Sequence, residues 1–142
     1  IYVADFFFTT CGNMCPKMTF QMERLNEEFS KDDDFILVSH TVTPEIDSIP
    51  VLKAYAIEHD AVAPKWHLLT GEKEDIYKLA RQSYFAVKDQ WKGDLGDFIH
   101  TENFVLVDKE GRIRGYYDGT DPEDVDKLIG EVAILKKEYE LN

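Results

Sequence analysis

Residues 4–20 read ADFFFTTCGNMCPKMTF, and this order of residues predicts a strand, a turn and a helix. The run over residues 1–9 is almost continuously apolar and rich in β-favouring residues, which is typical of a strand buried on both faces of a parallel sheet. A helix should begin near residues 11–16, because Pro16 is well tolerated in a first turn. Its inward side would carry apolar residues at helical spacing, namely Met18, Met22, Leu25 and Phe29.

The rest of the chain continues this alternation of strands and helices. Apolar runs predict further strands at residues 35–43, 66–69, 104–108 and 113–118, with Gly111 in a hairpin turn between the last two. Helices are expected at residues 48–59, with Ser48 as the N-cap, at residues 72–84, and after Asp121 and Pro122. The last helix should turn six residues inward: Val125, Leu128, Ile129, Val132, Leu135 and Tyr139. Residues 90–101 show no clear period and are expected to form a loop.

The order β-α-β-α-β-α-β-β-α predicts an α/β fold with helices on both faces of the sheet. A hairpin near the end of the chain makes that sheet mixed. This is the order of a thioredoxin-like fold with an inserted strand–helix unit. No linker or internal repeat interrupts residues 1–142, so we expect a single domain.

Composition and charge argue against two classes of binding partner and against a membrane-spanning segment. The net charge is −12 with no cluster of Lys or Arg, which disfavours binding to nucleic acid or to an anionic membrane surface. No apolar stretch approaches the roughly 20 residues that span a bilayer. The chain starts at Ile1, already inside a strand-like run, so we expect that a leader, an anchor or a first element is missing.

Cys11 and Cys15 carry the most informative chemistry. Cys11 lies where the first strand gives way to a helix, and the free N–H groups of a helix N-terminus favour a thiolate. If the helix has begun by Cys11, Cys15 lies one turn on, with Cβ atoms about 5–6 Å apart, which suits a soft ion such as Cu(I) or Zn(II). A disulfide needs about 3.8 Å, which a deformed first turn can reach, so redox chemistry stays open.

A metal would need a third ligand, and the chain has four histidines. His40 and His67 lie in predicted strands and His59 at a predicted helix end, where each has an ordinary structural role. His100 lies in an irregular loop just before a buried strand. Because loops at strand ends build the sites of α/β folds, His100 is the candidate third ligand.

The segment DFFFTTCGNMCPKMT resembles the signature of the SCO/SenC family, which are copper-handling proteins with a thioredoxin-like fold. Further matches follow in order: VTPEIDSIPVLKAYA, WHLLTGEKEDIYKLARQSY and DFIHTENFVLVDKEGRIRGYY. The resemblance covers nearly the whole chain. The family binds copper through two cysteines and a loop histidine, and these positions match Cys11, Cys15 and His100. Asp47 matches a common family acid, which we interpret as a supporting residue rather than a ligand.

The resemblance implies a metallochaperone rather than an enzyme. It would carry Cu(I) or Cu(II) to the dinuclear copper site in subunit II of cytochrome c oxidase, or prepare the cysteines of that site. Another copper carrier or a thiol reductase is a further expected partner. The resemblance also implies an extracytoplasmic domain, facing the periplasm and tethered to the membrane only through an N-terminal anchor.

Two alternatives remain open. A thiol–disulfide oxidoreductase or thiol peroxidase would use Cys11 as the attacking thiolate and Cys15 as the resolving thiol, with no need for His100. A purely structural module would hold the two cysteines in an inert disulfide. The aromatic run at residues 6–8 is interpreted as core rather than as a docking patch.

Overall fold

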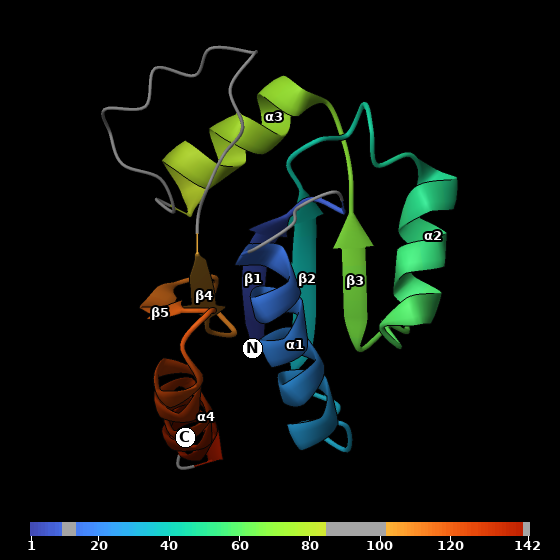
Figure 1. The fold of residues 1–142 in the computed structure, drawn as a ribbon. Coiled ribbons are helices and arrows are strands. Elements are labelled where there is room, and N and C mark those ends of the chain that lie inside the picture. Colours follow the sequence, from blue (N-terminus) through green and yellow to red (C-terminus); the bar gives the residue numbers. More distant parts are fainter. Residues whose placement is uncertain (10–13, 85–101, 141–142) are drawn as a thin grey trace.

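The computed structural model describes residues 1–9, 14–84 and 102–140, and it has the expected alternation of strands and helices (Figure 1). The strands are β1 (Tyr2–Phe7), β2 (Ile36–Thr41), β3 (Trp66–Leu69), β4 (Asn103–Val107) and β5 (Ile113–Asp118). The helices are α1 (Met14–Glu28), α2 (Ile49–Glu58), α3 (Lys73–Lys78) and α4 (Pro122–Glu140). The α3 helix continues as a π-helical turn, Leu79–Ser83.

The strands form one mixed sheet in the order β3-β2-β1-β4-β5. The first three strands are parallel, whereas β4 is antiparallel to both β1 and β5. Crossovers between parallel strands are right-handed, so the two successive steps from β1 to β2 to β3 place α1 and α2 on the same face. Figure 1 shows β3 at one edge with α2 beside it, and α1 in front of the strands.

Two apolar clusters cover opposite faces of the sheet. On one face, Val3 and Leu37 pack with residues of α1 and α4. On the other face, Ala4 and Phe6 pack with residues of α3. Successive residues of a strand point to opposite faces, so the run over residues 1–9 supplies both clusters. The prediction of a mixed sheet with helices on both faces is therefore confirmed.

The start and the inward face of α4 also agree with the sequence. Asp121 accepts a hydrogen bond from the backbone N–H of Glu123 at 3.0 Å, which is the bond of an N-cap residue. Pro122 occupies the first turn. The six residues expected to turn inward all belong to the α1–α4 cluster, with Ile129 and Tyr139 partly buried.

Two details differ from the expectation. Ser48 stands at the N-cap of α2, but its hydroxyl makes no capping hydrogen bond within the described residues, and Pro50 removes one of the two backbone N–H groups that could donate such a bond. The helix expected over residues 72–84 remains α-helical only to Lys78. Its π-helical turn ends with a bond from Tyr84 N to Leu79 O at 3.0 Å.

Candidate functional site

The described site begins at the edge of the sheet where β1, β2 and β3 end. Parallel strands share this carboxyl edge, and α1 starts there with Cys15 as its second described residue. Cys11, His100 and the loop expected at 90–101 lie outside the described residues. Within residues 1–9, 14–84 and 102–140, no three His, Cys, Asp or Glu side chains form a group that could hold a metal. The ligand set of Cys11, Cys15 and His100 stays a prediction.

Asp47 is placed beside that edge and is completely buried. Its carboxyl group accepts hydrogen bonds from Thr41 Oγ1 at 2.7 Å and from Thr43 Oγ1 at 3.0 Å. It also accepts one from the backbone N–H of Thr9 at 3.2 Å and one from the Thr9 hydroxyl. Thr9 precedes Cys11 by two residues. Asp47 thus fixes the chain that leads into the first cysteine to the end of β2.

The three threonines around Asp47 were missed by the sequence reasoning. Thr41 and Thr43 are fully buried, and the Thr41 hydroxyl also accepts a bond from the Thr43 N–H at 3.1 Å. The signal was a pair of threonines at the end of an apolar strand, followed by an acid. Alone, that pattern is equally typical of a turn, so it could not have identified a buried network.

The three described histidines take structural positions. His59 caps the C-terminus of α2, and its Nδ1 contacts the carboxylate of Glu23 on α1. His67 is half-buried on β3. His40 is almost wholly buried and stacks on Phe6, with ring centroids 5.0 Å apart.

Burial changes the protonation of His40. It lowers the pKa of His40 to about 4, so the ring is neutral at neutral pH. The Nε2 atom has no hydrogen-bond partner within the described part of the chain. A T-shaped contact between Phe6 and Tyr84, at 5.7 Å, covers the same region of the sheet.

A second buried acid, Asp5, lies in the middle of β1 and was not anticipated. Ser39 Oγ donates a hydrogen bond to Asp5 Oδ1 at 2.5 Å, and Trp66 Nε1 donates to Ser39 Oγ at 3.0 Å. The chain of bonds therefore crosses the three parallel strands. Burial raises the pKa of Asp5 to about 7, although the Ser39 hydrogen bond opposes this rise.

A groove between α1 and α2 opens beside the cysteine-bearing edge. It has a volume of about 490 Å³, and Thr9 and Pro16 form part of its wall. Phe8 lines it as well, whereas Phe6 and Phe7 are buried. The interpretation of residues 6–8 as core therefore holds for Phe6 and Phe7 but is incomplete for the half-buried Phe8.

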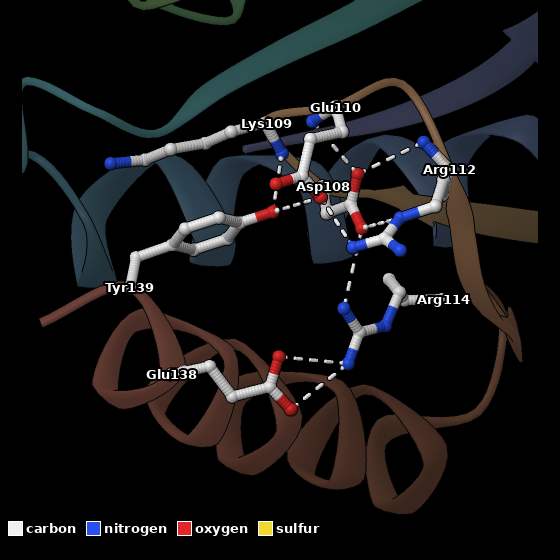
Figure 2. Close-up of polar contacts among 7 residues, drawn as sticks. All are labelled: Asp108, Lys109, Glu110, Arg112, Arg114, Glu138 and Tyr139. Carbon is white, nitrogen blue, oxygen red and sulfur yellow. Dashed lines mark hydrogen bonds and ion pairs between the residues drawn. The ribbon is translucent and has the colours of Figure 1, made fainter. Parts of the chain in front are cut away.

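The largest described cluster of charged side chains surrounds Asp108 and is shown in Figure 2. Asp108 follows β4, which is antiparallel to β1, so this cluster lies at the end of the sheet away from the start of α1. Its carboxylate accepts bonds from the N–H groups of Glu110 and Arg112, both at 2.9 Å. The guanidinium groups of Arg112 and Arg114 approach it at 3.1 and 3.2 Å, and Arg114 also bonds Glu138 of α4.

These contacts connect the β4–β5 turn to β5 and, through Arg114 and Glu138, to α4, so the Asp108 cluster has a structural role. Burial alone would raise the pKa of Asp108, but the backbone N–H groups and the two guanidinium groups outweigh burial and lower the pKa to about 2. The carboxylate is enclosed, with its side chain fully buried, so it is not available to a ligand.

Comparison with known proteins identifies the family. The family model described as SCO1/SenC matches residues 1–135. The chain belongs to the SCO1/SenC family. A curated relative, the SCO1 protein homolog of Bacillus subtilis (strain 168), is 31% identical over 134 residues, which are 93% of this chain and 69% of that protein. The resemblance inferred from the cysteine segment is therefore confirmed.

Solved structures of Sco proteins share this fold. A SCO1/SenC family lipoprotein from Bacillus anthracis str. Ames is 31% identical, with a TM-score of 0.80, and the match covers 95% of this chain and 80% of that one. BsSco, described as a member of the Sco family of cytochrome c oxidase assembly proteins with a disulfide switch, is 30% identical, with a TM-score of 0.77 and coverages of 96% and 80%. Arabidopsis thaliana ScoI with copper bound is 25% identical, with a TM-score of 0.73 and coverages of 97% and 84%.

Sco proteins thus include copper-bound structures and oxidase assembly proteins, and the thioredoxin-like fold expected from sequence is confirmed. One Sco relative is described as a lipoprotein. Among the helices that the structure describes, none combines the length and apolarity that a bilayer crossing requires.

Proposed function

We propose that this chain binds one copper ion through Cys11, Cys15 and His100 and acts in cytochrome c oxidase assembly. On this proposal it delivers copper to the dinuclear site of subunit II, as a carrier rather than an enzyme. The observation that supports it most is the SCO1/SenC match over residues 1–135, together with a copper-bound Sco structure of 25% identity that covers 97% of this chain.

The chemistry of the three residues suits a transferable copper ion. Thiolates satisfy soft Cu(I), and a third, imidazole ligand allows Cu(II) to be held as well. Cys15 lies in the first turn of α1, where the helix dipole favours a thiolate. The hydrogen bonds of Asp47 to Thr9 hold the strand end that leads to Cys11, which supports a positioning role for Asp47.

A thiol–disulfide oxidoreductase is the second candidate, favoured by the disulfide switch described for BsSco. In that step Cys11 and Cys15 form a disulfide, and the two electrons and two thiol protons pass to a disulfide of the partner, which becomes a dithiol. The dithiol form binds copper and the disulfide form does not. The same residues could therefore prepare the acceptor cysteines and then carry the metal.

We further propose that the domain works on the extracytoplasmic side of a membrane. A relative described as a lipoprotein supports this location. A thiol reductase or a second copper carrier would then be needed there to keep Cys11 and Cys15 reduced and loaded.

Anaerobic copper titration of the fully reduced chain tests the proposal. Cu(II) is followed by its sulfur-to-copper charge-transfer absorption, and Cu(I) by competition with a chelator. We expect one copper per chain, and loss of Cu(II) binding in His100→Ala. His67→Ala is the matched control, since His67 is half-buried on the edge strand β3, and it should bind as the unaltered chain does.

The same proteins separate the two candidates. If all three bind copper weakly and equally while reducing protein disulfides rapidly, the carrier proposal is wrong and the oxidoreductase remains. If copper binds tightly but His100→Ala and His67→Ala behave alike, the ligand set is wrong.

A further inference from the structure

The α2 helix leaves apolar residues uncovered on its side toward α1. Leu52 is its one buried residue in the described structure. On the side of α2 that lines the groove toward α1, Val51 is 38% exposed and Ala54 is exposed as well. Figure 1 places α2 at the edge of the molecule beside β3, on the opposite side from α4. An apolar face of this kind on a folded domain is typical of an interaction surface.

Polar contacts hold α2 firmly against α1, so the groove between them is preformed. Thr19 and Tyr55 share a hydroxyl–hydroxyl hydrogen bond of 2.6 Å. Farther along the two helices, His59 contacts Glu23. A partner would meet an existing surface and would not have to order it on binding.

The groove begins at the end of β1 and the start of α1. Its apolar part, about 490 Å³ in volume, is lined chiefly by Phe8, Thr9, Pro16, Val51, Ala54 and Tyr55. Thr9 stands two residues before Cys11, and Pro16 directly follows Cys15. A side chain bound in this part would therefore lie next to the chain that carries both cysteines.

The groove then continues into an acidic part. This second hollow, of about 530 Å³, shares Glu58 and His59 with the first and adds Glu23, Glu27 and Asp60. Neither Glu27 nor Glu58 has an ion pair in the part of the chain that the structure describes.

Lys65, which lines this acidic part, offsets only part of the negative charge of Glu23, Glu27, Glu58 and Asp60. The side-chain amine of Lys65 is bonded to the backbone oxygens of Phe29 at 2.7 Å and of Phe35 at 2.9 Å, and it also contacts the backbone oxygen of Asp32. Its hydrogen-bond donors are therefore occupied by backbone oxygens, and its single positive charge faces four carboxylate side chains. The acidic part keeps an excess of negative charge that would attract a cationic side chain.

We infer that this α1–α2 groove docks an extended segment of a partner protein. The segment places an apolar side chain against Val51, Ala54 and Tyr55, and a Lys or Arg a few residues away against Glu27 and Glu58. This inference rests on the proposed function, in which the docked protein exchanges copper or thiol electrons at Cys11 and Cys15. A net charge of −12 opposes the alternative occupant, an anionic membrane surface.

Selection from a phage-displayed library of random dodecapeptides, with the reduced metal-free chain as target, tests the groove. Selected sequences should combine an apolar residue with Lys or Arg. Synthetic versions should bind Ala54→Arg at least about tenfold more weakly, because the new side chain fills the apolar part and repels the cation. Glu58→Lys should weaken binding as well.

Ile57→Arg is the matched control. It adds the same charge to the same helix at a residue that lines neither part of the groove, so binding should change by less than about twofold. Equal weakening by Ala54→Arg and Ile57→Arg, selected peptides without basic residues, or binding to vesicles of anionic phospholipid in place of peptides would each overturn the inference.

The copper titration keeps this inference separate from the proposed function. Ala54→Arg should still bind one copper per chain, since Ala54 is an exposed residue of α2 and not a proposed ligand. If the unaltered chain binds peptides in the groove but no copper, the proposed function fails and the groove stands.

Discussion

Replacing Asp47 with alanine should loosen the cysteine-bearing edge of the sheet. The substitution removes all four hydrogen bonds that Thr9, Thr41 and Thr43 donate to the carboxyl group. Each such bond contributes about 1 kcal/mol net, and buried donors left without a partner add to the loss. Because the threonine hydroxyls can partly re-pair, we expect the free energy of unfolding to fall by about 3–4 kcal/mol.

Urea unfolding of the reduced, metal-free chain at neutral pH measures this loss. Asp47→Asn keeps one acceptor oxygen and should lose about half as much. Asp33→Ala is a control for removal of an aspartate, because Asp33 is exposed in the loop before β2, and it should change stability by less than about 0.5 kcal/mol.

A second measurement separates global stability from positioning. At temperatures where Asp47→Ala is still folded, it should bind Cu(II) more weakly than Asp33→Ala, because Thr9 no longer holds the approach to Cys11. A stability loss below about 1 kcal/mol, or copper binding equal to that of Asp33→Ala, would refute the reasoning.

Three further predictions concern stability. Gly119→Ala should destabilise the fold by about 1–3 kcal/mol, because the added methyl group would overlap the buried ring of Phe104. Gly130→Ala should instead stabilise α4 by about 0.5–1 kcal/mol, because its added methyl group meets no neighbouring atom. The urea midpoints of the two variants check this pair. The lowered pKa of Asp108 stabilises the fold above its unfolded pKa of 3.8, and this contribution is lost as the pH falls through about 2. Asp108→Asn should therefore be about 1–2 kcal/mol less stable at neutral pH, and acid titrations followed by circular dichroism should show a shallower loss for the variant in that window. The raised pKa of Asp5 acts in the opposite sense, because the free energy of unfolding falls by up to about 4 kcal/mol as the pH rises from 3.8 to about 7. Asp5→Asn should flatten this pH dependence, which urea unfolding repeated across that range measures. Parallel slopes for Asp5→Asn and the unaltered chain would contradict the last prediction.

The fold was predictable because its elements carry strong local signals. The apolar run before Cys11, the turn glycine Gly111 and the Asp121–Pro122 start of α4 each have one dominant structural meaning. The exact ends of the elements are harder to place from sequence, and β1, β2 and β4 stop one or two residues short of the expected bounds at several ends.

The π-helical turn at Leu79–Ser83 could not be anticipated in the same way. The apolar spacing of Ile76, Leu79 and Ala80 fits an uninterrupted α-helix, and a π turn leaves no mark in such a pattern. Tyr84, which follows this turn, packs against Phe6 and His40, a contact that is made only in the folded sheet.

The candidate site was only partly predictable. Asp47 was singled out by resemblance and not by its surroundings, because the threonines that donate to it come from two separate strand ends. Asp5 was overlooked because an acid in an apolar run gives no sign of its partners, which here are Ser39 on the next strand and, beyond it, Trp66. Networks that cross strands depend on register, and a single sequence does not contain the register.

The three backbone contacts of Lys65 also give the protein a built-in reporter for chemical labelling. An amine that donates to the backbone oxygens of Phe29, Asp32 and Phe35 is a poor nucleophile toward acylating reagents, whereas the exposed Lys53 and Lys17 are open to them. Mass spectrometry of acetylated peptides would therefore measure the local opening of the α1–β2 connection as acetylation of Lys65 relative to Lys17 and Lys53, without an introduced probe.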